Sequence, residues 1–212
     1  MRLAEFLLNP EPAHHEAADQ CICYLLGTKN LAICFSGAAE DSLTCMSDAS
    51  FGDHVSDRKS SQGYVIKLFG GPILWKAGKQ NTVTTSSTEA KLLALTNYAK
   101  ELMALDRLLS QIQLRLDGPL TLKCDNRQTV RLLEAEFTKL FTKLRHVDVH
   151  RHWLRQEVQR KALQVDWVPT GEMIADGLTK ALPRQRFKRF VDQLGLVDIT
   201  GIIEAQKESD DN

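Results

Sequence analysis

The stretch GYVIKLFGGPILWKA (residues 63–77) decides the fold class, because it predicts two neighbouring strands joined by a tight turn. Apolar and β-branched residues fill both halves, and Gly70, Gly71 and Pro72 between them favour a turn. A third run of this kind, residues 43–49, lies upstream. Three closely spaced strands predict an antiparallel meander.

Helical spacing replaces the strand pattern after the meander. From Ser86 to about Ile112, apolar side chains recur every three or four residues, which predicts a long amphipathic helix. Shorter strands and helices are expected at 120–124, 127–135, 148–160, 163–168, from about 172, and at 185–194. Three strands followed by alternating helices and strands predict a mixed α/β fold, with one sheet flanked by helices.

Residues 1–42 precede this pattern and form a prefix. A helix from about Pro10 to Gly27 and a short strand at 31–35 are expected within it. This helix is expected to pack through Ala17, Cys21, Tyr24 and Leu25. The polar and acidic residues 197–212 are expected to be disordered, so we predict one main domain at 43–196.

The composition is that of a globular domain. With 212 residues, 43% of them hydrophobic, the chain can bury one sizeable α/β core. Its 27 basic and 27 acidic side chains cancel, so the overall charge does not indicate a nucleic-acid partner. No 18-residue apolar run and no cleavable signal pattern occurs, so nothing in the sequence argues for membrane insertion or secretion.

The five cysteines have no paired spacing, and we interpret them as buried, reduced thiols of an intracellular protein. The alternative is a zinc site built from His14, His15, Cys21 and Cys23. Their spacing fits no standard zinc pattern, so we do not expect one.

Four acids stand at the ends of predicted elements: Asp48, Glu89, Asp125 and Asp176. Each has a structural explanation when it is taken alone. Ser86 with Glu89 fits a helix capping box, and Asp125 with Gln128 fits an N-cap pair. Asp48 could be a turn residue, and Asp176 could complement a helix dipole.

Taken together, the four acids indicate a metal site. Carboxylates that converge repel one another unless cations lie between them. Oxygen ligands without an accompanying His or Cys favour magnesium or manganese over zinc. Two such ions can activate a water molecule and stabilise the leaving oxygen of a phosphodiester, which indicates phosphodiester hydrolysis.

Six strings around these acids resemble the ribonuclease H domain of copia-type retrotransposon Pol polyproteins. The strings are SDAS (47–50), DRKSSQGY (57–64), SSTEAK (86–91), CDN (124–126), WVPTGEMIAD (167–176) and GLTKALP (177–183). The prefix segment NPEPAHHEAADQCICYLLGT (9–28) resembles the connection from this domain to the upstream reverse transcriptase. The resemblance covers about residues 3–196.

The resemblance implies a ribonuclease H-like five-stranded mixed sheet with helices on both faces. It implies that Asp48 bridges two Mg²⁺ ions, that Glu89 and Asp125 complete one ion site, and that Asp176 completes the other; Mn²⁺ can substitute. The implied activity is endonucleolytic cleavage of the RNA strand of an RNA/DNA hybrid. The implied setting is intracellular, beside the upstream reverse transcriptase, in cytoplasmic virus-like particles for an active element, and without a membrane.

The loop before Asp176 departs from the wider superfamily. Cellular and retroviral ribonucleases H carry a histidine there, whereas residues 167–173 contain none. Copia-type domains share this shortened loop, so the departure fits the family. It leaves the proton donor to the leaving oxygen unassigned, with Glu172 as a candidate.

A basic stretch could follow a phosphate backbone. Seven Lys or Arg against two acids lie between Lys139 and Lys161, a local excess of five positive charges. An ordinary solvated helix face is the alternative. The residues expected to contact nucleic acid are Arg58, Lys59, Lys143, Arg145, Arg151 and Arg155.

Two functions other than an active ribonuclease are possible for such a sequence. A degenerate retroelement remnant would bind nucleic acid or a partner without cutting, and metal-dependent cleavage separates it from the enzyme. A strand-transfer enzyme of the integrase type needs its acids in the order Asp, Asp, Glu. The order here is Asp48, Glu89, Asp125, Asp176, so we set that function aside.

Overall fold

The computed structural model describes residues 2–35, 43–54, 56–116, 118–134 and 145–210. The chain divides into two compact units. The larger unit is Cys34–Gly195, and the smaller one combines Met1–Ile33 with Leu196–Asn212. The larger unit thus holds nearly all of the domain predicted at 43–196.

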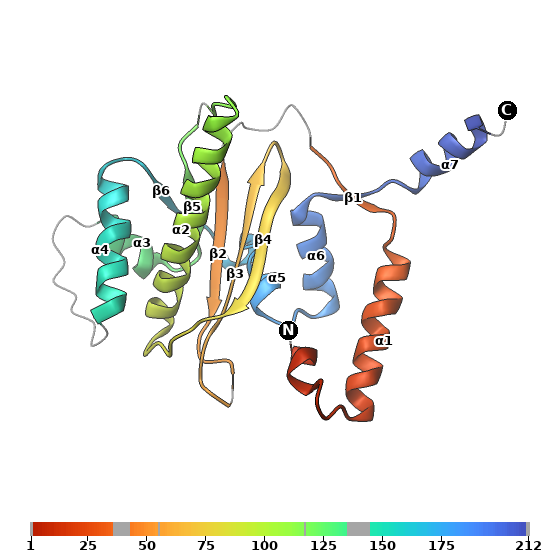
Figure 1. Cartoon of the computed structure of the whole chain (residues 1–212), viewed down its shortest axis with the longest axis horizontal. Coiled ribbons are helices and arrows are strands. Elements are labelled where there is room, and N and C mark those ends of the chain that lie inside the picture. Colours follow the sequence, from red (N-terminus) through yellow and green to blue (C-terminus); the bar gives the residue numbers. More distant parts are fainter. Residues whose placement is uncertain (1, 36–42, 55, 117, 135–144, 211–212) are drawn as a thin grey trace. The chain divides into compact units, whose positions relative to one another are not determined.

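A five-stranded mixed sheet forms the centre of the larger unit (Figure 1). Its strands are β2 (Thr44–Ser50), β3 (Ser61–Leu68), β4 (Gly71–Lys79), β5 (Thr121–Cys124) and β6 (Gln164–Trp167). In the order β4-β3-β2-β5-β6, the first three strands pair antiparallel, while β5 runs parallel to β2 and β6 parallel to β5. The predicted meander and the ribonuclease H-like mixed sheet are confirmed.

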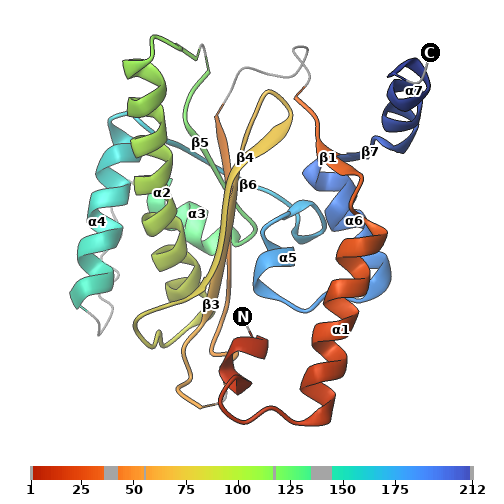
Figure 2. The same cartoon turned by 45° about the vertical axis from the view of Figure 1, so that its right-hand side comes forward.

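Helices lie on both faces of this sheet (Figures 1 and 2). One face carries α2 (Ser87–Gln111), α3 (Arg127–Glu134) and α4 (Arg145–Gln159). The other carries the short helix α5 (Asp176–Thr179), which follows the 3-10 turn η2 (Thr170–Glu172). Helix α6 (Arg184–Leu194) packs against α5 through Phe190.

The core of the larger unit lies between the sheet and α2. On the helix, Ala90, Leu95 and Leu102 are completely buried, and they share one cluster with Cys45 and Leu122 of the central strands. The apolar spacing that predicted α2 therefore marks its buried face, except near the C-terminal end, where Leu105 and Leu109 are partly buried and Ile112 is exposed.

The smaller unit contains η1 (Arg2–Phe6), α1 (Pro12–Gly27), β1 (Leu31–Ile33), β7 (Leu196–Asp198) and α7 (Thr200–Asp210). Strands β1 and β7 pair antiparallel. Residues 197–212 were expected to be disordered, whereas the structure has a strand and a helix there, and Thr200 donates two hydrogen bonds to the side chain of Asp198. Helix α1 buries none of its residues, and Tyr24 and Leu25 of its expected packing face are exposed.

All five cysteines are free thiols. Cys45 and Cys124 are buried as expected, whereas Cys21, Cys23 and Cys34 are exposed. None of the described helices combines the length and apolar character that a bilayer-spanning segment needs.

Candidate metal centre

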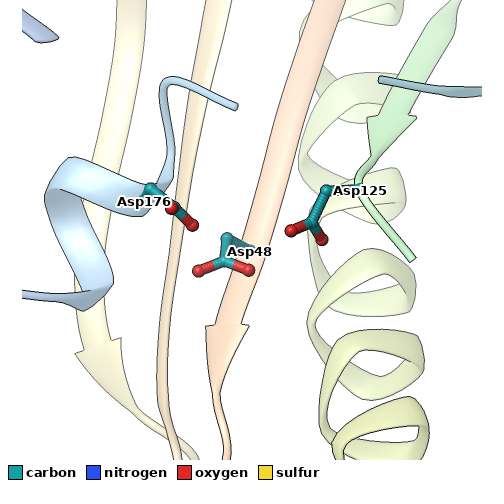
Figure 3. Close-up of side chains that lie close together, drawn as sticks. All are labelled: Asp48, Asp125 and Asp176. Carbon is teal, nitrogen blue, oxygen red and sulfur yellow. The ribbon is translucent and has the colours of Figure 1, made fainter. Parts of the chain in front are cut away.

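Three aspartates from three separate elements come together in the larger unit. Asp48 lies in β2, Asp125 directly follows β5, and Asp176 is the first residue of α5. Their carboxylates point toward one another (Figure 3), and one oxygen from each lies within 4.8 Å of the others. Three of the four acids predicted to bind metal therefore lie close together in the structure.

The strand register brings Asp48 and Asp125 to the same level of the sheet. Met46 of β2 pairs with Lys123 of β5, and two residues further along each chain Asp48 comes level with Asp125. The chain turns into α3 immediately afterwards, because the side chain of Asn126 accepts a hydrogen bond from the amide of Thr129 at 2.9 Å. Asn126 therefore caps α3, the alternative of Asp125 as an N-cap with Gln128 does not hold, and the Asp125 carboxylate faces the cluster.

Two glycines let α5 approach close enough to place Asp176. A Cβ atom on Gly177 of α5 would lie 2.4 Å from Phe190 Cδ2 of α6. A Cβ atom on Gly63 of β3 would lie 2.7 Å from Leu178 Cβ of α5. Both distances are below any ordinary contact, so no larger residue fits either position without a shift.

Two lysines neutralise part of the carboxylate charge. Lys91 Nζ, from α2, donates hydrogen bonds to Asp48 Oδ1 at 2.8 Å and to Asp125 Oδ1. Lys180 Nζ donates to Asp176 Oδ1 at 2.7 Å and lies 3.5 Å from Asp48 Oδ2. Neither lysine was expected at the site from the sequence, although the spacing of Asp176 and Lys180 is that of an ion pair along a helix.

Hydroxyl groups bind the second carboxylate oxygens of Asp48 and Asp125. Thr179 Oγ1 donates to Asp48 Oδ2 at 2.5 Å, and Thr170 Oγ1 donates to Asp125 Oδ2 at 3.2 Å. Asp48 is fully buried, so its charge depends on these partners.

The charges of the cluster shift the pKa values of its members. Burial alone would raise the pKa of Asp48, but the ammonium groups of Lys91 and Lys180 and the bound hydroxyl lower it from 3.8 to about 2. Burial, aided by the negative charge of Asp48, raises the pKa of Asp176. Burial opposes the charge on Lys91, but the two aspartates outweigh it and raise the Lys91 pKa. At neutral pH, Asp48 is therefore ionised beside a charged lysine.

Glu89 does not belong to the group of three aspartates. Its Oε2 atom accepts hydrogen bonds from the amide of Thr85 at 2.8 Å and from Thr85 Oγ1 at 2.6 Å. The Glu89 amide donates to Ser86 Oγ at 3.1 Å, which is half of the capping box considered from the sequence. In this structure the Glu89 carboxylate binds Thr85, which directly precedes the N-cap residue Ser86 of α2.

The residues predicted to contact nucleic acid have different surroundings. Arg58 is exposed and Lys59 half-buried, both in the segment between β2 and β3. Arg155 is half-buried, and Arg151 is only 4% exposed, so Arg151 does not lie on an open basic face as expected. Lys143 lies outside the described residues, as does the side chain of Arg145.

A cavity of about 270 Å³ adjoins the cluster on the side of α6. Asp176 contributes to its wall, together with Arg186 and Arg189 of α6. Glu172, the candidate proton donor, is exposed in η2 and is not among the residues that line this cavity.

The donor set fits a hard divalent cation. It consists of carboxylate oxygens alone, and their mutual distances allow a shared ion. Asp125 and Asp176 keep 6% and 15% of their side chains exposed, so an ion can enter from solvent. The ammonium groups of Lys91 and Lys180 bind oxygens of the same three carboxylates and would have to yield them to a cation.

No protein-family model matches the chain. The chain is 34% identical, over 194 residues or 92% of its length, to the retrovirus-related Pol polyprotein from transposon TNT 1-94 of Nicotiana tabacum. It is 32% identical, over 198 residues or 93% of its length, to the corresponding polyprotein from transposon RE1 of Arabidopsis thaliana. These matches span only 14% and 13% of the two polyproteins.

Two further similarities concern shorter proteins. Secreted RxLR effector protein 161 of Plasmopara viticola is 36% identical over 99 residues, which are 47% of this chain and 70% of that protein. The solved N-terminal RNase H domain of Rv2228c from Mycobacterium tuberculosis is similar with a TM-score of 0.48 at 13% identity, over 72% of this chain and 98% of that one.

The larger unit is a ribonuclease H-like mixed α/β domain, as its strand order and the three aspartates beside the central strand β2 indicate. Within that class, the chain is a homologue of plant retrotransposon Pol polyproteins, of which it spans about one seventh. The resemblance inferred from its six strings is confirmed.

Proposed function

We propose that this chain is a ribonuclease H that cleaves the RNA strand of RNA/DNA hybrids endonucleolytically, with divalent cations held by Asp48, Asp125 and Asp176. The observation that carries this proposal is the convergence of these carboxylates to within 4.8 Å in a chain of the Pol family. Oxygen-only ligands suit Mg²⁺, for which Mn²⁺ can substitute. Asp48, Asp125 and Asp176 would hold the cations, which would supply activation of a water molecule and stabilisation of the leaving oxygen.

The side chains around the aspartates orient them for this task. Thr179 holds one oxygen of Asp48, and Thr170 holds one oxygen of Asp125, so each carboxylate is limited to a narrow range of rotation. Residues that orient metal ligands in this way commonly alter metal affinity by about 10- to 100-fold.

Glu89 is proposed as a further ligand on the Asp125 side. Its carboxylate would have to leave Thr85, so Glu89→Gln tests this assignment. A loss of metal affinity would support it. A loss of stability alone would leave Glu89 as a helix cap.

The proposed substrate is the RNA/DNA hybrid, contacted through Arg58, Lys59 and Arg155. Hybrid recognition depends on groove shape and 2′-hydroxyls, so little base specificity is expected. We also propose that the upstream reverse transcriptase domain is the partner of the prefix. The exposed apolar residues Ile22, Leu25 and Leu26 of α1 support a surface that another domain covers.

The test is a cleavage assay on labelled RNA/DNA hybrid, double-stranded RNA and double-stranded DNA, with Mg²⁺, Mn²⁺ or EDTA. We expect cleavage of the hybrid alone, in either metal and not in EDTA. Asp48→Asn and Asp125→Asn should abolish it, because each removes a charged ligand. Wild-type rates in either folded variant would refute the assignment.

The second candidate function is a remnant that binds nucleic acid or a partner without cutting. The lysines within the cluster and the Glu89 carboxylate turned to Thr85 favour it. Hybrid binding without any metal-dependent cleavage would identify it.

A further inference from the structure

Lys91 lies inside the acidic cluster rather than on the surface of α2. It stands in the second turn of that helix, and its side chain is only 12% exposed. Its Nζ atom donates to Asp48 Oδ1 at 2.8 Å and also to Asp125 Oδ1. One ammonium group therefore joins the two carboxylates of neighbouring strands.

These two oxygens are the ones that a cation between Asp48 and Asp125 would use. An ammonium group and a divalent cation repel each other at such short range, so they cannot both hold the same pair. Lys91 is covalently attached to α2, and its concentration at the cluster is therefore fixed, whereas a metal ion must be drawn from solution.

The other side of the cluster differs. Lys180 contacts Asp176 Oδ1 and approaches Asp48 Oδ2, but 38% of its side chain is exposed, so it can move into solvent at little cost. Lys91 is enclosed and bridges two acids. The two halves of the cluster should therefore take up cations unequally.

We propose that Lys91 is a tethered competitor of the divalent cation on the Asp48–Asp125 side, and sets the metal concentration at which that side fills. This inference rests on the proposed metal-dependent function, and it assigns Lys91 a positioning role that acts through Asp48 and Asp125. The half of the site beside Asp176 fills first, and the half beside Asp125 fills at higher cation concentration.

The first test measures Mn²⁺ binding to the full chain by titration calorimetry. Lys91→Gln should tighten the weaker of the two Mn²⁺ equilibria by about 10- to 100-fold, the range by which neighbours of a metal site alter its affinity. Lys91→Arg keeps the positive charge and should stay within about threefold of the wild type, well below that range. The matched control is Lys100→Gln, because Lys100 is on the same helix but exposed over the ring of Trp153.

Thermal unfolding gives a second readout that does not depend on activity. In EDTA, Lys91→Gln should melt below the wild type, because buried Asp48 loses a charged partner. Saturating Mn²⁺ should narrow that difference in Tm, since the variant binds the ion more tightly.

A third measurement uses the unmodified sequence and so does not depend on a variant folding. Reductive methylation of lysines, read by peptide mass spectrometry, should label Lys91 faster with Mn²⁺ than with EDTA, while labelling of Lys100 is unchanged. Faster labelling indicates that the ion has displaced the ammonium group from the two aspartates.

The outcomes separate this inference from the proposed function. Equal Mn²⁺ affinities in wild type and folded Lys91→Gln, or equal labelling of Lys91 in both conditions, would overturn the competitor role alone. No Mn²⁺ binding to either folded protein would overturn the metal centre itself.

Discussion

The substitution Gly177→Ala should damage the cluster without touching a carboxylate. The new Cβ atom would stand 2.4 Å from Phe190 Cδ2, 2.6 Å from Cε2 and 2.7 Å from Cγ, whereas ordinary contacts begin at 3.4 Å. The overlap of about 1 Å must be relieved by moving the Phe190 ring, or α5, or both. Overpacking of this kind lowers the free energy of unfolding by about 1–3 kcal/mol. For a chain of this size that corresponds to a fall in Tm of about 2–12 °C.

A movement of α5 carries Asp176 with it, because Asp176 immediately precedes Gly177. A displacement near 1 Å can lower the rate of a positioned reaction by about 100-fold. We would measure Tm in EDTA, Mn²⁺ affinity, and cleavage of labelled hybrid. The control is Gly78→Ala, since a Cβ atom at Gly78 has nothing within 4 Å.

The double variant Gly177→Ala with Phe190→Leu tests the cause. Leucine lacks the ring atoms that meet the new methyl group, so the two substitutions should be less harmful together than their separate effects predict. A wild-type Tm in Gly177→Ala, or strictly additive losses in the double variant, would refute the close packing of α5 on α6 as the determinant of Asp176 placement.

Three further predictions concern the same unit. The pKa of Asp48 is lowered from 3.8 to about 2 in the folded state, so ionised Asp48 stabilises the fold above pH 3.8. As the pH falls from 5 to 2, the free energy of unfolding should therefore decrease by about 2 kcal/mol. Urea unfolding in EDTA should show this loss in the wild type but not in Asp48→Asn, and parallel curves would disprove it. Thr179→Val removes the hydroxyl that binds Asp48 and should lower the free energy of unfolding by about 1.5–3 kcal/mol in the same assay. Thr179→Ser keeps a hydroxyl and should lower it less, and equal losses in the two variants would show that the hydroxyl is not responsible. Replacing Arg58 and Lys59 by Glu should weaken hybrid binding and reduce the slope of log affinity against log salt by about 0.9 for each phosphate that is no longer neutralised, and an unchanged slope would remove both residues from the proposed interface.

Most of the fold of the larger unit could be predicted because its signals are local. Short apolar runs bounded by turn residues identified β2 to β4, and the three- to four-residue spacing identified α2. The pairing of β1 with β7 was missed, since Leu31–Ile33 and Leu196–Asp198 are three residues each and far apart in sequence. Such short strands gain their stability from a partner that no local pattern reveals.

The positions of the three aspartates followed from the sequence strings, but the contacts of their neighbours did not. Whether the Glu89 side chain turns to the cluster or to Thr85 is a choice of rotamer, and both choices suit the same helix start. The bridge from Lys91 to Asp48 and Asp125 joins α2 to two strands, so it emerges only when the three elements pack.

The burial of Arg151 could have been anticipated. Arg151 stands three residues before Leu154, and this spacing places both on one face of a helix. Leu154 is completely buried in the core, and Arg151 is 4% exposed beside it. Counting charges along the stretch, without assigning them to helix faces, gave too broad a basic surface.

The β1–β7 ribbon has a mechanical consequence for the larger unit. Ile33 pairs with Leu196, so the points where the chain enters and leaves the larger unit are held about 5 Å apart. A force that pulls the flanking segments in opposite directions acts first on the outer pair, Leu31 with Asp198, and opens the ribbon one pair at a time. Until its three pairs have separated, no tension reaches the sheet that carries Asp48 and Asp125. The ribbon therefore protects the larger unit from tension that is applied to the segments flanking it.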